Sequence, residues 1–163
     1  MIIATVEPWV EPPLKQYVDD ARARMALLLH PSGQVVAQAG FSRAVDVMTA
    51  CALAAAVHAT SRELGRQLEG DTTRRGKSFD GLHHGGEQVQ LHLAPVETRG
   101  GSYICLTVFD AESSLGLVRM YFADLCAALA AAAPRFAVKR TPALAADFEH
   151  DLNRNLAGLF GRS

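Results

Sequence analysis

Apolar residues recur along this chain at two spacings, one typical of helices and one typical of strands. Leu14, Tyr17 and Ala21 share one helical face just after a pair of prolines, which predicts a first helix. Five runs rich in alternating or β-branched apolar residues lie between turn-forming segments. These runs predict strands over residues 25–29, 34–39, 79–84, 88–96 and 102–109.

A long alanine-rich segment without proline, residues 44–68, predicts a second helix. Apolar side chains share one of its faces, which we expect to pack on the sheet: Val47, Ala50, Leu53, Ala54, Val57, Leu64 and Leu68. The opposite face has small apolar side chains followed by charged ones: Met48, Ala52, Ala55, Ala56 and Ala59, then Arg62, Glu63 and Arg66. A water-exposed helix is normally polar there, so we expect a partner to cover it. The alternative is an alanine content that reflects helix propensity alone.

Two further helices are predicted in the C-terminal half. Ser113 or Ser114 can cap a helix that Pro134 ends, and its apolar stripe comprises Leu115, Val118, Phe122, Leu125, Cys126 and Leu129. Thr141 and Pro142 have the pattern of a helix start, and the apolar line that follows comprises Leu144, Phe148, Leu152, Leu156 and Leu159. We therefore expect a domain over residues 1–133, then a linker and amphipathic helix over residues 134–163.

Composition and charge narrow the possible partners. The 163 residues are 49% hydrophobic and 20% charged, which suits one packed domain. With 16 Lys and Arg against 17 Asp and Glu residues, the net charge of -1 gives no general attraction to nucleic acid. The longest apolar stretch, residues 123–133, contains Asp124 and is shorter than the ~20 residues of a membrane span. The start of the chain lacks a basic, signal-like segment, so we expect a cytoplasmic protein without a membrane span.

Two patterns suggest ligand binding at first sight. Residues 70–78 resemble a phosphate-binding loop, but they have one residue too many between their glycines and follow a predicted helix, so we interpret them as a solvated basic loop. His83, His84 and His92 could meet if two strands pair. Since adjacent strand residues point to opposite faces, we interpret all three as strand or turn histidines rather than metal ligands.

The sequence contains no recognisable catalytic constellation. No serine lies in a GxSxG elbow, and we interpret His58 as a packed, hydrogen-bonded side chain. Cys51, Cys105 and Cys126 are widely spaced within apolar runs, as is typical of reduced core thiols. The sequence therefore predicts a protein that is not an enzyme and has no cofactor and no metal.

Two segments resemble a known family. The predicted order of helices and strands, together with ALLLHPSGQVVA at residues 26–37, resembles the Roadblock family of dynein light chains. The segment LTVFDAESSLGLVR at residues 106–119 resembles the strand, acidic turn and helix start of its MglB-like branch. The match covers about residues 12–133, and MglB proteins also have a C-terminal extension.

The resemblance implies an α/β (α+β) sandwich: a five-stranded antiparallel sheet with one long helix on one face and two on the other, plus a C-terminal helix. It also implies a homodimer, in which the third strand pairs with its symmetry mate and the two long helices lie side by side. The expected interface residues are Phe79, Asp80, Leu82 and His84 of the strand, with Ala55 and Ala59 of the helix.

For function, the MglB-like branch implies binding of a small Ras-like GTPase of the MglA type. It implies stimulation of GTP hydrolysis without an arginine finger, in cell polarity and gliding motility. The expected contacts are Met48, Ala52, Ala55, Ala56, Ala59, Arg62, Glu63 and Arg66. Phe148, Leu152 and Leu156 either touch the GTPase or fold back on their own domain. Other Roadblock dimers are non-catalytic scaffolds or adaptors, which is the alternative function.

Overall fold

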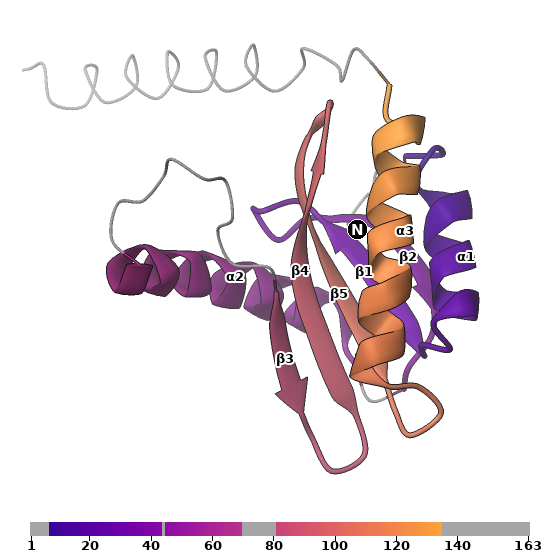
Figure 1. Ribbon diagram of the computed structural model, residues 1–163, viewed down its shortest axis with the longest axis horizontal. Helices are drawn as coiled ribbons and strands as arrows, with labels where there is room; N and C mark the ends of the chain where they lie inside the picture. The colour runs from indigo at the N-terminus through magenta and orange to yellow at the C-terminus, as the bar shows by residue number, and fades with distance from the viewer. Residues whose placement is uncertain (1–6, 44, 70–80, 135–163) are drawn as a thin grey trace, which may run out of the picture.

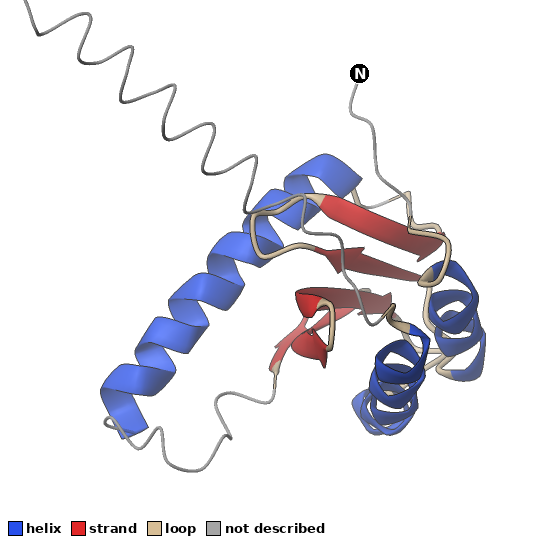
Figure 2. Cartoon of the chain, turned by 90° about the horizontal axis from the view of Figure 1, so that it is seen from above, coloured by secondary structure: helices blue, strands red, loops and turns tan. Residues whose placement is uncertain are grey.

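A single five-stranded antiparallel sheet forms the centre of the molecule (Figure 1). The computed structural model describes residues 7–43, 45–69 and 81–134. The strands are β1 (Met25–Leu29), β2 (Val35–Gly40), β3 (Leu82–Gly85), β4 (Gln90–Thr98) and β5 (Gly101–Phe109), in the spatial order β2-β1-β5-β4-β3. Helices α1 (Glu11–Asp20) and α3 (Leu115–Ala132) lie side by side on one face, and α2 (Val47–Glu69) crosses the other (Figure 2). The predicted α+β sandwich is confirmed, whereas the predicted C-terminal helix lies outside the described residues.

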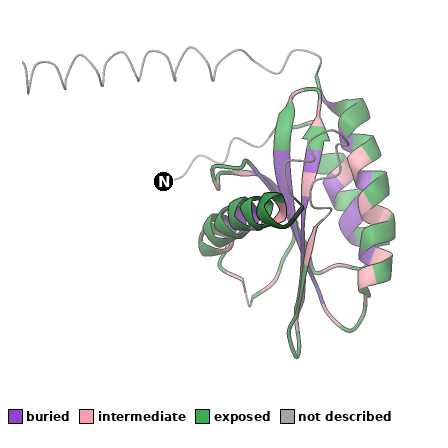
Figure 3. Ribbon diagram, turned by 60° about the vertical axis from the view of Figure 1, so that its left-hand side comes forward, coloured by how far each residue is buried: buried purple, intermediate pink, exposed green. Residues whose placement is uncertain are grey.

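The sheet has a separate apolar core on each face. Met25, Leu27 and Leu29 of β1 point toward α2, and Ala26 and Leu28 point toward α1 and α3. Because side chains alternate along a strand, both sets are buried only if helices cover both faces. This explains why β1 is apolar at every position and why all five of its residues are buried (Figure 3).

The ends of the elements follow local capping chemistry. Ser114 is the N-cap of α3, since its hydroxyl accepts a hydrogen bond from the Leu117 backbone N–H at 3.2 Å. Ser113, the other candidate, instead donates its hydroxyl to the Ala21 carbonyl. At the start of α2, the Asp46 carboxylate accepts from the Thr49 backbone N–H at 3.3 Å. This cap places the first residue of α2 at Val47 rather than at the predicted residue 44.

The orientation of α2 differs from the prediction. Its buried residues are Cys51, Ala54, Ala55 and His58, at the spacing of one helical face. Leu53, Leu64 and Leu68, which we expected on the sheet, are 60%, 57% and 77% exposed, and Val57 is 39% exposed. Apart from His58, small side chains therefore form the contact line and let the helix lie close to the sheet.

Two features explain this orientation. The β1–β2 turn lies against α2. A Cβ added to Gly33 in this turn would be 3.6 Å from the Ala52 Cα and 3.7 Å from the Ala55 Cβ, which is ordinary van der Waals contact. In addition, the C-terminal half of α2 extends past the sheet (Figure 2). Leu64 and Leu68 belong to this half and are exposed. Helical periodicity identified an apolar side correctly, but it could not specify which side contacts the sheet.

Candidate functional site

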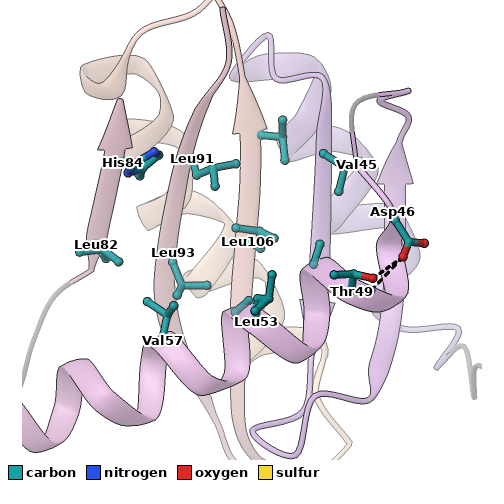
Figure 4. A pocket seen from close by; sticks show the side chains of 13 residues that line it. Val45, Asp46, Thr49, Leu53, Val57, Leu82, His84, Leu91, Leu93 and Leu106 are labelled. Atoms are coloured by element: carbon teal, nitrogen blue, oxygen red, sulfur yellow. Dashed lines mark hydrogen bonds between the residues drawn. The ribbon is translucent and has the colours of Figure 1, made fainter. Parts of the chain in front are cut away.

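An open apolar groove of about 550 Å³ lies between α2 and the β3 side of the sheet (Figure 4). We call it the α2 groove. Leu53 and Val57 of α2 form one wall, and Leu82 and His84 of β3 form the other. The remaining lining residues come from the start of α2, β4 and β5: Val45, Asp46, Thr49, Ala50, Ala54, Leu91, Leu93, Leu106 and Val108.

The pairing of β3 with β4 determines which of their side chains line the α2 groove. β3 pairs with β4 so that Leu82 lies opposite Leu93 and His84 lies opposite Leu91. Cross-strand partners share a face, so these four side chains all point toward α2. The groove is thus a continuation of the α2-side core that the described residues leave uncovered.

The polar groups of the α2 groove are few and mostly engaged. The Thr49 hydroxyl and the Thr49 backbone N–H both donate to the Asp46 carboxylate, and these two hydrogen bonds hold the pKa of Asp46 below its usual value. His84 is exposed at the opposite wall. Since the other lining residues are apolar, the groove is suited to burying the apolar surface of a partner.

The wall of the groove formed by β3 is also an edge of the sheet. β3 pairs with β4 on one side and is the terminal strand in the order of the described sheet. A terminal strand presents backbone N–H and C=O groups that another strand can pair with. The predicted interface residues Leu82 and His84 lie on this strand, while Phe79 and Asp80 lie outside the described residues.

The predicted contact surface on α2 is only partly exposed. Met48, Ala52, Ala56 and Ala59, which we call the outer strip, are exposed, whereas Ala55 is 9% exposed and contacts the β1–β2 turn. Ala55 therefore has a packing role within its own chain. The predicted residues Phe148, Leu152 and Leu156 lie outside the described part of the chain.

Charged side chains at the end of the outer strip interact with one another. Arg66 forms an ion pair with Glu63, which also accepts a hydrogen bond from Gln67 at 3.1 Å. His58 is buried beside this region, and burial, with the charge of Arg62 second, lowers its pKa below the usual value. His58 is packed as predicted, but the predicted hydrogen bond is not seen, since its Nδ1 has no partner among the described residues.

The strand histidines divide between the two faces of the sheet, with His84 on one face and the cross-strand partners His83 and His92 on the other. His84 lines the α2 groove, whereas His83 lies on the other face, stacked on Phe109 at 6.1 Å and hydrogen-bonded to Gln90 at 2.9 Å. His92 is buried beside Phe122, and burial lowers its pKa to about 4. Within the described ranges, no cluster of three or more His, Cys, Asp or Glu side chains is arranged to hold a metal.

The three cysteines carry free thiols. Cys51 and Cys105 are buried and Cys126 is partly buried. Burial raises the pKa of Cys105 to about 12 and that of Cys126 to about 11, so these thiols stay protonated near neutral pH. The phosphate-loop-like segment at residues 70–78 lies outside the described part of the chain.

Sequence reasoning missed the α2 groove itself. Leu53 and Val57 were recognised as apolar but assigned to the core, and Leu91 was recognised only as part of a strand. No local signal marks the groove, because the orientation of α2 decides which part of the sheet face stays open, and the spacing of apolar residues does not specify that orientation.

Comparison with known proteins gives matches only to solved structures. No protein-family model matches the chain, and no curated protein sequence matches it. MglB from Myxococcus xanthus is similar with a TM-score of 0.64 and 24% identity, over 76% of this chain and 93% of that one. An MglB structure described as having a tetrameric arrangement gives 0.60 and 26%, over 82% and 93%.

A third solved structure widens the comparison beyond MglB. A Roadblock/LC7 domain from Streptomyces avermitilis is similar with a TM-score of 0.57 and 19% identity, over 76% of this chain and 94% of that one. The sheet order, the helix placement and the nearly full coverage of each relative agree with one another. The chain therefore has the Roadblock fold in its MglB-like form.

Proposed function

We propose that this protein is a homodimeric, cytoplasmic regulator that binds a small Ras-like GTPase of the MglA type and stimulates its GTP hydrolysis. The observation that carries the proposal is the apolar surface of α2 that the described residues leave uncovered, where Leu53, Leu64 and Leu68 are more than half exposed. An apolar surface of this kind marks a site of protein association. The likeness to MglB structures, one of them with a tetrameric arrangement, gives the kind of assembly.

A second copy of the chain is the first occupant of this surface. Pairing of β3 with its symmetry mate would continue the sheet across the dimer and satisfy its outer backbone groups. The partner's α2 would then lie near the α2 groove and cover Leu53 and Val57. Ala59 stays a predicted dimer contact, and Ala55 supports the surface from beneath.

The GTPase is the second occupant, on the outer strip and its charged end. Arg62, Glu63 and Arg66 are exposed there, and Arg66 is paired with Glu63. We propose that these side chains position the GTPase, so that its own residues become competent for hydrolysis without an inserted arginine. The protein would act in cell polarity or gliding motility as a regulator and not as an enzyme.

Two measurements test the proposal. Light scattering should give a dimer for the native chain and a monomer for Leu53→Asp, because a charge in the groove disfavours burial. The matched control Gln16→Asp, on the exposed side of α1, should stay dimeric. A native monomer at micromolar concentration would contradict the homodimer.

Phosphate release measures the activating role. The native protein should accelerate GTP hydrolysis by an MglA-like GTPase from the same organism, and Leu53→Asp should not. A stable complex with unchanged hydrolysis would replace activation with the alternative, a non-catalytic scaffold. Absence of any complex would contradict both functions.

A further inference from the structure

The outer face of α3 is a second apolar surface, on the opposite side of the sheet from the α2 groove. The helix packs on the sheet through Val118, Leu125 and Leu129, yet only 17% of it is buried. By length and composition alone, it is apolar enough to cross a membrane. Its outward side comprises Gly116, Met120, Ala123, Ala127 and Ala131, all exposed.

This outer face is not made of small residues alone. Met120 is 54% exposed, and the partly exposed Leu117 lies beside it on the helix. The two charged residues of α3, Arg119 and Asp124, are also exposed and lie on either side of this apolar stripe. A helix that is apolar on its outer side as well as its core side is normally covered by something.

The neighbouring helix shows that this apolar character is not required by the fold. α1 lies beside α3 on the same face of the sheet (Figure 1). Apart from Pro12, its exposed side chains are polar or charged: Glu11, Lys15, Gln16, Asp19 and Asp20. Two helices in similar positions thus have opposite outer surfaces, so the surface of α3 needs its own explanation.

The chain that follows α3 carries a complementary pattern. Leu144, Phe148, Leu152, Leu156 and Leu159 recur at the spacing of one helical face. This stripe, from residue 144 to 159, is as long as the outer face of α3 from residue 116 to 131, or about 22 Å of helix for each. The connection of about 8 residues between α3 and the predicted helix start is long enough to reverse the chain into an antiparallel pair.

We propose that residues 142–160 form a helix that packs antiparallel on the outer face of α3 of the same chain. The large side chains of the stripe lie over alanines, whose small size allows the two helices to approach closely. Met120 and Leu117 are buried at the far end of the contact. The stripe is then not free for another protein, and any partner that binds it must first displace it from α3. The proposal does not depend on regulation of a GTPase, since that surface is on the other face of the sheet.

Oxidation of methionine by dilute hydrogen peroxide tests the contact in the full chain. Met120 should be protected in the native protein, and Leu152→Asp should increase its oxidation rate severalfold. Met48, which is 49% exposed on α2, should keep the same rate in both proteins and serves as the internal reference. The control Asn153→Asp places the same charge about 100° around the predicted helix from Leu152, outside the apolar stripe, and should leave Met120 protected. Equal oxidation of Met120 in the native protein and in Leu152→Asp would overturn the proposal.

Cross-linking identifies the chain that provides the cover. Ala127→Cys and Ala145→Cys in one protein, joined by a short bismaleimide, should give a link within a single chain. In a mixture of unlabelled and ¹⁵N-labelled protein, linked peptides should carry one label only. Peptides with both labels would assign the cover to a second copy and overturn the proposal. Protection of Met120 that appears only after phospholipid vesicles are added would assign it to a bilayer and overturn it as well.

Discussion

The Tyr17 hydroxyl lies 2.8 Å from the Thr107 hydroxyl, which joins α1 to the central strand β5 inside the core. Thr107 is fully buried and Tyr17 is 3% exposed. Burial, as the largest cause, raises the pKa of Tyr17 well above its usual value, so the phenol stays protonated at all ordinary pH values. Each hydroxyl is the nearest hydrogen-bonding partner of the other, and the Thr107 hydroxyl also lies 3.8 Å from the Cys105 Sγ.

Removing this hydrogen bond should destabilise the fold. Tyr17→Phe leaves the Thr107 hydroxyl buried without that partner, and we expect a loss of about 1–3 kcal/mol in the free energy of unfolding. Urea denaturation followed by circular dichroism measures it. Tyr121→Phe, which removes a hydroxyl from a partly exposed ring on α3, should change the free energy by less than about 0.5 kcal/mol. Equal effects of the two substitutions would mean that the Tyr17–Thr107 contact contributes nothing specific.

Two glycines should respond to alanine in opposite directions. Gly40 has φ +73°, and a Cβ there would lie 2.3 Å from the Arg24 carbonyl oxygen, so Gly40→Ala should cost at least about 2 kcal/mol. Gly65 lies within α2 with no atom within 4 Å of an added Cβ, so Gly65→Ala should stabilise by about 0.5–1 kcal/mol. Thermal denaturation of both variants gives the comparison. A stabilising Gly40→Ala would contradict the conformation of the β2 end.

Much of the fold could be predicted because local signals mark its boundaries. The bounds of β1 agree with the prediction, since an apolar run ends there at a turn built on Gly33. The start of α3 at Leu115 follows from its serine N-cap, and its end follows from Pro134. Propensity and capping act within a few residues, so the sequence displays them directly.

The candidate site could not be predicted from local sequence, because it depends on contacts between residues far apart in the chain. Whether Leu53 or Ala55 of α2 faces the sheet is decided by the close approach of the β1–β2 turn, which lies about 20 residues away in the chain. Periodicity gives the angle between two side chains on a helix but not the direction of the sheet. The α2 groove was missed for this reason, although Leu53 and Val57 of its wall were recognised as apolar.

The free energy of unfolding should decrease as the pH is lowered below about 6.5, because His92 is buried in its neutral form. Burial, followed by the nearby charges of Arg119 and His83, lowers the pKa of His92 from 6.5 to about 4. The unfolded chain therefore binds a proton between these values and the folded chain does not, so acid favours unfolding. This group alone should reduce the free energy of unfolding by about 2 kcal/mol between pH 7 and pH 5.

The variant His92→Phe isolates this effect. His58, whose pKa is also lowered, contributes in the same direction and is unchanged in the variant. Urea denaturation at pH 7 and pH 5 should show a smaller loss for His92→Phe than for the native protein. Equal losses in the two proteins would show that His92 is protonated in the folded state, contrary to its burial beside Phe122.

Adjacent alanines on α2 should separate folding from partner binding. Ala55 is buried against the β1–β2 turn, so Ala55→Arg must force a charged side chain into the core and should cost more than about 2 kcal/mol of unfolding free energy. Ala56 is exposed on the outer strip, so Ala56→Arg should keep the native unfolding midpoint. If the outer strip binds the GTPase, Ala56→Arg should weaken that affinity about tenfold or more, a change of about 1.4 kcal/mol. Titration calorimetry with an MglA-like GTPase and thermal denaturation give the two readouts. Unchanged affinity in a folded Ala56→Arg variant would remove the outer strip from the interface and leave the α2 groove and its β3 edge as the surface for association.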